Sequence, residues 1–389
     1  MVDFSNTVIA FSMKSTNDLR AAYILFYAIQ SPLMVKASKS ITTLALRLQL
    51  PIFWAIKPTL FKQFVGGETL EDCKKTVDLL KIYNVKSVLD YSYEGDTNLE
   101  DVQRAYEETM RSIEFAKDNK NIAFTVFKPT TLIVERVLKK ASEDYSSLGD
   151  IEKAEYSNFK DRIFSICEKA CESNVKILVD AEDYAYQEIV DRIVEEAMRR
   201  FNQSRAIVFH TLQMYRTDRL NYLSFLHEDA KKHKYIPGIK LVRGAYMEDE
   251  RARAYELSYP DPIYPNKEST DRSYNQALKY VIDNINDFEL FSGSHNYESN
   301  QLLADLMDMK GLKRDDSRIY FAQLYGMSDN ISFILAKEGF NVCKYIPYSP
   351  VDKILPYLLR RASENTSIAG QTGRELQLIK TELERRGNL

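Results

Sequence analysis

The stretch IAFTVFKP at residues 122–129 decides the fold class. Its first six residues are apolar, aromatic or β-branched, which is typical of a short buried strand, and Lys128 and Pro129 end it. Similar short runs recur along the chain and are separated by longer stretches. They lie at Ser87–Tyr91, Ile122–Phe127, Lys176–Val179, Ala206–Phe209, Ile239–Val242, Phe288–Phe291, Ile319–Phe321 and Val342–Ile346. The sequence therefore predicts eight strands.

The stretches between these runs read as amphipathic helices. One of them places Val102, Tyr106, Thr109, Ile113 and Ala116 at helical spacing, so that one face is mostly apolar. Eight strands that alternate with helices predict an α/β protein whose parallel strands close into a (βα)₈ TIM-type barrel. A doubly wound open sheet is the alternative. No G-x-G-x-x-G sequence follows any predicted strand, which weakens that alternative.

The flanks of the barrel are expected to be helical. Residues 1–83 form a predicted N-terminal helical segment, in which Asn17 caps one helix and Thr69 opens another with a capping box. Residues 84–370 form the predicted barrel domain, which ends with a helix over the barrel mouth, and residues 371–389 form a C-terminal helical tail.

The composition excludes several classes of protein. The chain has 389 residues, a net charge of −3 and a pI of about 6.0, so no bulk basicity indicates nucleic acid binding. The four cysteines and four histidines show no metal-ligand spacing, and reduced thiols in a reducing compartment are expected. The apolar run Ala21–Ile29 is shorter than the ~20 residues that a bilayer requires. Asp3 and Asp18 argue against a transit peptide, so a cytoplasmic location is expected.

Polar residues stand at the carboxyl ends of all eight predicted strands. Because active sites of such barrels lie at the carboxyl ends of the strands, these residues predict a polar ligand over the barrel mouth. In chain order the candidates are Asp90, Tyr91 and Glu94; Lys128; Asp180 and Glu182; His210 and Gln213; Lys240, Arg243 and Gly244; Ser294, His295 and Asn296; Gln323; and Tyr345.

The stretch YLLRRASEN at residues 357–365 carries the sharpest local signal. Tyr357, Arg360, Arg361 and Glu364 lie at i, i+3, i+4 and i+7, so they share one helix face. Two adjacent guanidinium groups on that face suit an anion, and a substrate carboxylate is a natural partner because guanidinium binds it through two parallel hydrogen bonds. The alternative is a solvated charged face with an Arg360–Glu364 pair.

Two long segments carry a family resemblance. Residues 240–246, KLVRGAY, and residues 357–365 resemble the corresponding motifs of proline dehydrogenases, and they start 117 residues apart (357 − 240). Asp180-Ala181-Glu182, Ser294-His295-Asn296 and Gly326-Met327 resemble comparable stretches of the family. The resemblance covers at least residues 65–370, and the opening segment is similar to that of free-standing bacterial members.

The resemblance implies a role for each site residue. Arg360 and Arg361 are expected to hold the proline carboxylate with Lys128, and Glu94 to pair with one of the arginines. Tyr345, Tyr357 and Glu364 are expected to complete the substrate pocket, and Asp180 to orient its polar groups. The expected contacts of FAD are Gln213, Lys240, Arg243, Gly244, His295 and Asn296. Which of Lys240 and Arg243 faces the flavin stays open.

The implied activity is the oxidation of L-proline to 1-pyrroline-5-carboxylate by hydride transfer to flavin N5, the first step of proline catabolism. The resemblance also implies that the electrons pass to a membrane quinone through transient contact with a membrane surface. That surface is expected to be the inner membrane, which a eukaryotic protein would reach from the mitochondrial matrix. Tyr345 lies twelve residues before Tyr357, a spacing that resembles the branch selective for proline. The alternatives are a hydroxyproline dehydrogenase, an aldolase or lyase that uses Lys128 as a Schiff-base amine, a phosphate-binding barrel and a non-enzymatic regulator.

Overall fold

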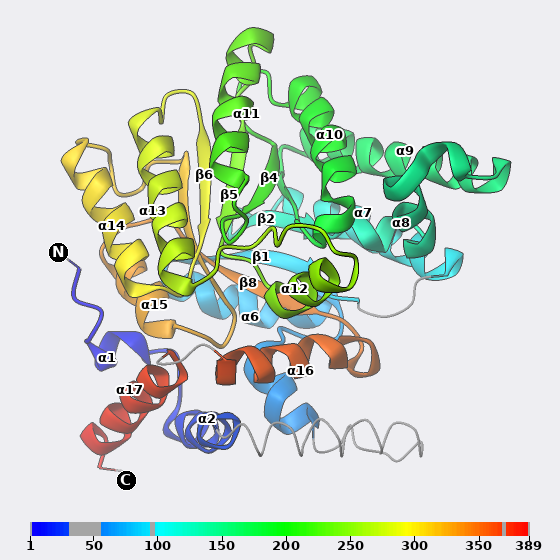
Figure 1. The fold of residues 1–389 in the computed structure, drawn as a ribbon. Helices are drawn as coiled ribbons and strands as arrows, with labels where there is room; N and C mark the ends of the chain where they lie inside the picture. Colours follow the sequence, from blue (N-terminus) through cyan, green and yellow to red (C-terminus); the bar gives the residue numbers. More distant parts are fainter. Residues whose placement is uncertain (1, 31–55, 94–97, 368–370, 388–389) are drawn as a thin grey trace. The chain divides into compact units, whose positions relative to one another are not determined.

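A computed structural model describes residues 2–30, 56–93, 98–367 and 371–387, with the side chains of 362–372 left out. Its eight parallel strands follow one another round a closed barrel in sequence order (Figure 1). They are β1 (Val85–Tyr91), β2 (Ile122–Phe127), β3 (Lys176–Val179), β4 (Val208–Gln213), β5 (Gly238–Val242), β6 (Glu289–Gly293), β7 (Ile319–Leu324) and β8 (Val342–Tyr348). The predicted (βα)₈ barrel is confirmed, and the open sheet is excluded.

At six of the eight strands the predicted bounds differ from the observed ones by one to four residues. β2 and β3 begin and end at the predicted residues. The prediction for β4 was wrong, because the strand continues from Val208 through His210 to Gln213. His210 points out of the barrel to Asp191, and Gln213 lies on the opposite strand face, so polar residues continue this strand rather than end it.

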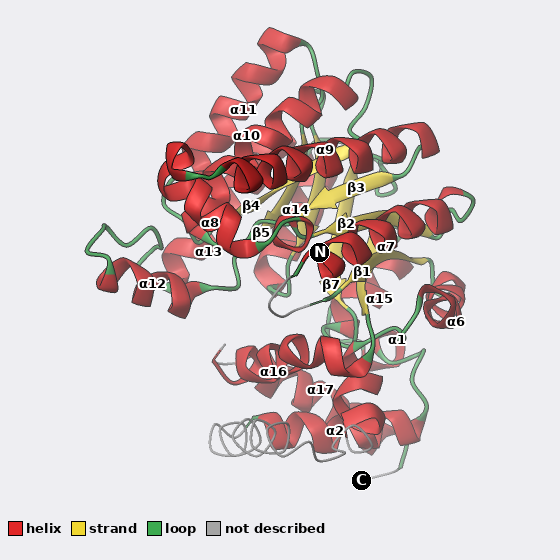
Figure 2. Cartoon of the chain, turned by 90° about the vertical axis from the view of Figure 1, so that its right-hand side faces the viewer, coloured by secondary structure: helices red, strands yellow, loops and turns green. Residues whose placement is uncertain are grey.

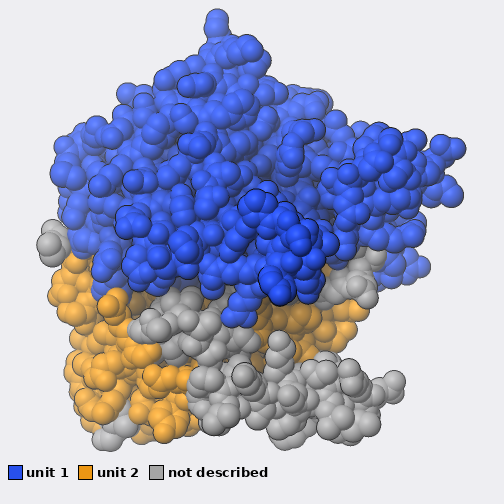
Figure 3. Space-filling model, in the orientation of Figure 1, with its two compact units in different colours: residues 1, 96–322 blue, residues 2–95, 323–389 orange. Residues whose placement is uncertain are grey.

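The chain divides into two compact units, residues 1 and 96–322 and residues 2–95 and 323–389, which Figure 3 colours separately. The predicted division into an N-terminal segment, a barrel domain and a tail stays a prediction.

Unit 1 holds strands β2 to β6 and most of β7, surrounded by helices (Figure 2). The helices are α7 (Leu99–Lys117), α8 (Glu135–Asp144), α9 (Asp150–Ser173), α10 (Tyr184–Phe201), α11 (Arg219–His233), α12 (Met247–Glu256), α13 (Lys267–Asp283) and α14 (Tyr297–Met309), with the short 3₁₀ helices η2 (Pro129–Leu132) and η3 (Tyr145–Ser147). In α7 the Asn98 side chain accepts hydrogen bonds from the first turn, and Val102 and Ile113 are buried as the amphipathic pattern predicted.

An aromatic cluster fills the barrel interior of unit 1. The Phe124 ring meets those of Phe209, Phe291 and Tyr320 edge to face, with centroids 5.2, 5.0 and 5.0 Å apart. The ammonium group of Lys176 lies 5.6 Å from the centroid of the Phe124 ring. Because this packed layer leaves no room for a ligand at its level, the polar side chains that can bind one stand nearer the carboxyl ends of the strands.

Unit 2 holds β1 and β8, which pair in parallel from Val85 with Val342 to Tyr91 with Tyr348. Its helices are α1 (Thr7–Ala10), α2 (Thr16–Ile29), η1 (Lys57–Phe61), α5 (Lys62–Phe64), α6 (Leu70–Ile82), α15 (Asp329–Lys337), α16 (Val351–Ser367) and α17 (Gln371–Arg385). A hydrophobic core that contains Phe26, Phe64, Leu358 and Leu383 joins α2, α5, α16 and α17.

The two predicted helix caps in unit 2 had different outcomes. Thr69 caps α6 as predicted, since its side chain accepts a hydrogen bond from the Asp72 amide. The prediction for α2 was wrong: Ser15, not Asn17, accepts from the amide of Asp18. Serine and asparagine are both common N-cap residues, and the helix begins directly after Ser15, which comes first in the sequence.

Candidate functional site

In unit 1 the predicted site residues follow strands β2 to β6. Lys128 comes directly after β2, Asp180 after β3 and Arg243 after β5, while Gln213 ends β4 and His295 lies two residues beyond β6. Parallel neighbouring strands end on the same rim of a barrel, so these side chains share one rim within the unit.

A buried ion pair joins two of these strand ends. The Lys240 ammonium group donates to Asp180 Oδ1 at 2.5 Å, and the two side chains are 7% and 16% exposed. Lys240 also lies 5.9 Å from the centroid of the Phe291 ring, which faces the barrel interior with Phe124. The pair therefore places a fixed positive and a fixed negative group side by side on the inner face of the barrel.

Gln213 lies near this pair, at the end of β4, which is the neighbour of the strand that carries Lys240. Its amide nitrogen donates to the carbonyl oxygen of Ala181 at 3.3 Å, and the residue is only 3% exposed. Its side-chain oxygen accepts no hydrogen bond from the part of the chain that the structure describes. A buried acceptor of this kind suits a donor group on a ligand, because leaving it unsatisfied costs free energy.

Arg243 is held by three side chains. Its Nε donates to Asp271 at 2.7 Å, Nη1 to the Ser294 hydroxyl at 2.8 Å and Nη2 to the Ser299 hydroxyl at 2.9 Å. Its guanidinium carbon also lies 4.5 Å from the centroid of the Tyr274 ring. These contacts use three of the five N–H donors of arginine, so the group is fixed in place while donors remain for a ligand.

Gly244, the next residue, has a φ of +129°, which only glycine adopts readily. A Cβ atom there would come within 2.5 Å of the Tyr215 ring. The glycine is thus required by the path of the backbone, and this explains it without any contact to a cofactor.

The segment after β6 is organised by its own hydrogen bonds. Asn296 caps α14, because its side-chain oxygen accepts from the Ser299 amide at 2.9 Å. Ser294 accepts from both Arg243 and the Asn296 amide. His295 lies between Ser294 and Asn296 in the sequence and is half-buried, so these hydrogen bonds fix the backbone on both sides of it.

Glu182 lies on the same rim. It was a strand-end candidate in the sequence, but the resemblance gave it no role. It is 8% exposed, and burial raises the pKa of its carboxyl group to about 7. The sequence offered a signal, since Glu182 follows Asp180 by two residues and therefore shares the strand end. A carboxyl group with a strongly perturbed pKa at a strand end is a candidate functional residue.

In unit 2 the paired arginines lie on α16, half-buried, as predicted. The guanidinium group of Arg361 lies over the Tyr357 ring, 5.2 Å from its centroid, and Tyr357 is 5% exposed. This i,i+4 contact confirms that the two residues share a face. The side chain of Glu364, and Glu94, lie outside the described residues.

Tyr345 is 8% exposed and belongs to β8. The prediction that it ends the strand was wrong, because β8 runs on to Tyr348 through Pro347. Its neighbour Lys344 pairs with Asp329 on α15. Since successive strand residues point to opposite faces, Tyr345 faces the inner side of the strand.

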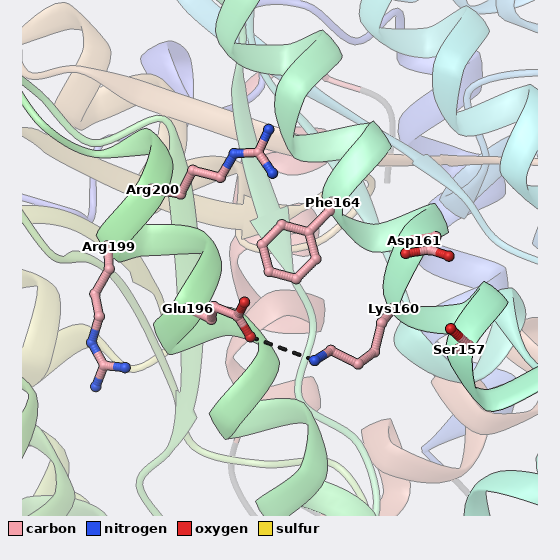
Figure 4. Close-up of a pocket in the computed structure, with 7 residues that line it drawn as sticks. All are labelled: Ser157, Lys160, Asp161, Phe164, Glu196, Arg199 and Arg200. Carbon is pink, nitrogen blue, oxygen red and sulfur yellow. Dashed lines mark ion pairs between the residues drawn. The ribbon is translucent and has the colours of Figure 1, made fainter. Parts of the chain in front are cut away.

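A separate hollow of about 560 Å³ lies on unit 1 between α9 and α10, away from the predicted residues (Figure 4). Its cations are already paired. Lys160 lies 3.5 Å from Glu196, and Arg199 and Arg200 bind Asp229 and Glu168 at 2.8 Å. None of the strand ends contributes to it, so we do not assign the active site there.

Comparison with known proteins gives one family. The sequence model described as proline dehydrogenase matches residues 73–374. The carbapenem antibiotics biosynthesis protein CarD of Pectobacterium carotovorum subsp. carotovorum is 36% identical over 83% of this chain and 83% of its own length. The mitochondrial proline dehydrogenase 1 of Homo sapiens is 40% identical over 63% of this chain, and the hydroxyproline dehydrogenase of Xenopus laevis is 30% identical over 97%.

Among solved structures, proline utilization A (PutA) of Bdellovibrio bacteriovorus matches 93% of the chain with a TM-score of 0.72 and 20% identity. This likeness supports the fold. The chain spans 42% of the length of the human relative and 38% of that PutA chain.

Proposed function

Because the chain belongs to the proline dehydrogenase family of oxidoreductases, we propose that it oxidises L-proline to 1-pyrroline-5-carboxylate with FAD as its cofactor. The observation that carries the proposal is the arginine pair of α16, which shares a face with Tyr357 and falls within the family match. A helix face with two adjacent guanidinium groups suits a small carboxylate.

On the substrate side, Arg360 and Arg361 bind the proline carboxylate, with Lys128 as a further cation. Tyr345 and Tyr357 present buried aromatic surfaces to the pyrrolidine ring. Fixing the carboxylate orients the ring, and orientation of this kind removes a large entropic part of a reaction barrier. The amine must be neutral to react. The cations that hold the carboxylate favour loss of the amine proton, because a nearby positive charge destabilises the protonated amine.

On the cofactor side, the strand ends of unit 1 fit a flavin. When bound, FAD accepts a hydride at N5 and so supplies the oxidation. Gln213 offers a buried acceptor to a ring N–H, and Lys240 offers a buried cation that favours a reduced, anionic ring. Arg243, Gly244, His295 and Asn296 form the rest of the proposed contact surface.

The electrons must leave the protein after each turnover, and we propose a membrane quinone as their acceptor. In the described part of the chain, no helix is both long and apolar enough to cross a membrane. The form of membrane contact that we propose is a transient surface contact, at the inner membrane or, in a eukaryote, at the membrane that faces the mitochondrial matrix.

An absorbance scan of the purified protein tests the proposal. We expect oxidised flavin bands that bleach when L-proline is added without oxygen. Protein without flavin bands would favour the aldolase or lyase alternative, in which Lys128 forms a Schiff base that borohydride traps. Bands that bleach with trans-4-hydroxy-L-proline but not with L-proline would favour a hydroxyproline dehydrogenase, the activity named for the Xenopus laevis relative.

A further inference from the structure

The buried carboxylate of Glu182 holds one residue with both of its oxygens. Oε2 accepts from the Thr130 amide at 2.9 Å, and Oε1 accepts from the Thr130 hydroxyl at 2.7 Å. The two residues are 52 positions apart, so the contact joins the loop after β3 to the loop after β2. A hydrogen bond to an ionised carboxylate is about twice as strong as one to a neutral acceptor, so ionisation of Glu182 strengthens both contacts.

Thr130 lies two residues after Lys128, in the 3₁₀ turn η2. The carbonyl oxygen of Lys128 accepts from the Thr131 amide at 3.1 Å and from the Thr131 hydroxyl at 2.7 Å. The turn from 128 to 131 is therefore fixed at both of its ends. The side chain of Lys128 starts from a backbone whose position Glu182 determines.

Glu182 is itself held from behind. Its amide donates to Gln187 Oε1 at 3.1 Å, and Gln187 Nε2 donates to Asp191 Oδ1 at 2.8 Å. Asp191 in turn accepts from Arg219 at 2.7 Å and lies 3.0 Å from His210 Nε2. The support is a continuous chain of buried polar contacts from α10 and α11 to the strand end.

Burying this carboxyl group is unfavourable, as its raised pKa shows, and Asp180 adds to that cost while Lys128 reduces it. A structural contact between two loops does not require a buried charge, because a neutral pair or apolar packing would serve. The location of the charge beside Lys128 and Asp180 indicates a role in the site instead.

We propose that Glu182 is a positioning residue, which sets the affinity for the substrate carboxylate by holding Thr130 and thereby the backbone of Lys128. The inference rests on the proposed function, because it assigns Lys128 to the carboxylate of proline. It adds a residue whose side chain does not itself bind the substrate.

The test compares Glu182→Gln, Thr130→Val and Thr130→Ser in the flavin-loaded enzyme. Glu182→Gln removes the charge and one of the two acceptor oxygens, so the Thr130 hydroxyl can no longer donate to a carboxylate, and Thr130→Val removes that hydroxyl. We expect each to raise the KM for L-proline roughly tenfold, with kcat and flavin content within about twofold of wild type. Thr130→Ser keeps both donors and should restore the wild-type KM. An unchanged KM in both Glu182→Gln and Thr130→Val would overturn the inference.

The same substitutions in a Lys128→Met background show whether Glu182 acts through Lys128. If it does, Glu182→Gln changes the KM of Lys128→Met by less than about twofold, because the group that it positions is absent. An equal effect in both backgrounds overturns the inference, and so does a normal KM in Lys128→Met. Absence of proline oxidation in the wild type would instead remove the proposed function. Should Glu182→Gln fail to fold, the Thr130 pair decides alone.

Discussion

Two buried lysine–aspartate pairs stand on barrel strands of this protein, one in each unit. Lys240 on β5 binds Asp180 at 2.5 Å, and Lys344 on β8 binds Asp329 at 2.8 Å. Both lysines are almost fully buried, at 5% and 0% exposure. The two pairs are alike in residue type, in distance and in the burial of the lysine, while Asp180 is more exposed than Asp329, at 16% against 3%.

Their surroundings differ. Lys240 faces the barrel interior, beside the Phe291 ring and the strand ends that carry the candidate site. Lys344 points outward and also donates to the Met327 carbonyl at 2.5 Å, while Lys14 reaches Asp329 at 3.3 Å. The outward pair therefore joins β8, α15 and the N-terminal segment, and nothing about it requires a ligand. The face of the strand, rather than the chemistry of the pair, separates a candidate functional group from a structural one.

Removing each lysine should sharpen this contrast. Lys344→Met leaves Asp329 buried with only Lys14 nearby, and we expect the free energy of unfolding to fall by about 3–5 kcal/mol. Lys240→Met leaves Asp180, which is 16% exposed, so the expected loss is about 1–2 kcal/mol, together with loss of proline oxidation.

Urea denaturation followed by circular dichroism measures both losses. Lys337→Met, at an exposed position of α15, serves as the control and should change stability by less than about 0.5 kcal/mol. Equal losses of stability for Lys240→Met and Lys344→Met would contradict the comparison.

The arginine pair of α16 provides the next test. Arg360→Met or Arg361→Met should raise the KM for L-proline roughly 30- to 1000-fold, which corresponds to about 2–4 kcal/mol for one charge-assisted contact. Flavin content should stay at the wild-type level. Asp352→Asn on the same helix is the matched control, because its exposed side chain lies off the helix face that carries the two arginines. A wild-type KM in both arginine variants would sink the carboxylate assignment.

Sequence predicted the barrel well, because eight apolar runs each contain enough β-branched and aromatic residues to indicate a strand. It failed at β4 and at the ends of β7 and β8, where His210, Gln323 and Pro347 look like strand terminators but lie within strands. An apolar run in the sequence indicates a buried strand. It does not indicate a strand residue that is polar and bonds to a buried partner, so such residues are assigned to loops.

The candidate site was less accessible to sequence than the fold. The helical spacing of 357–361 was enough to place Tyr357 with Arg361, because i,i+4 contacts are local. The contact of Glu182 with Thr130 joins residues 52 apart, and no local pattern indicates such a pair. Likewise the use of Asn296 as a helix cap emerges only from the geometry of α14.

Tyr345 tests a finer property, the preference among substrates. Its ring lies on the inner face of β8, next to outward-facing Lys344, and would crowd a 4-hydroxyl group. We expect a preference for L-proline over trans-4-hydroxy-L-proline of no more than ~10²-fold, since a single hydroxyl is hard to reject by shape. Tyr345→Ser should reduce the preference for L-proline, mainly by lowering kcat/KM for L-proline, because an aromatic packing surface is lost. The measurement is the ratio of kcat/KM values for the two substrates, and an unaltered ratio would place Tyr345 outside the pocket.

The smallest expected effect concerns the outward pair and its neighbour on α17. Glu375 is 8% exposed, and burial, with a further contribution from Asp329, raises the pKa of its carboxyl group to about 7. Lys14, Lys344 and the Ser328 amide act in the opposite direction. On the same helix, Arg385 and Arg386 lower the pKa of Glu382 to about 2, against the effect of its burial.

These two carboxyl groups should give stability opposite dependences on pH. Between about pH 4.5 and 7 the folded protein binds more protons at Glu375 than the unfolded chain does, so this group lowers the free energy of unfolding as pH rises through that window. Glu382 is ionised in the folded state down to about pH 2, so its contribution is present above about pH 4.5 and is lost as pH falls towards 2. Glu375→Gln should therefore remove a decrease in stability of roughly 2 kcal/mol between pH 5 and 8, while Glu382→Gln should leave that range unchanged and flatten the acid limb below pH 4.5. Urea unfolding at intervals of half a pH unit measures both contributions. A Glu375→Gln curve parallel to that of wild type from pH 5 to 8 would contradict the prediction. It would show that Glu375 is already ionised when buried, stabilised by Lys14 and Lys344.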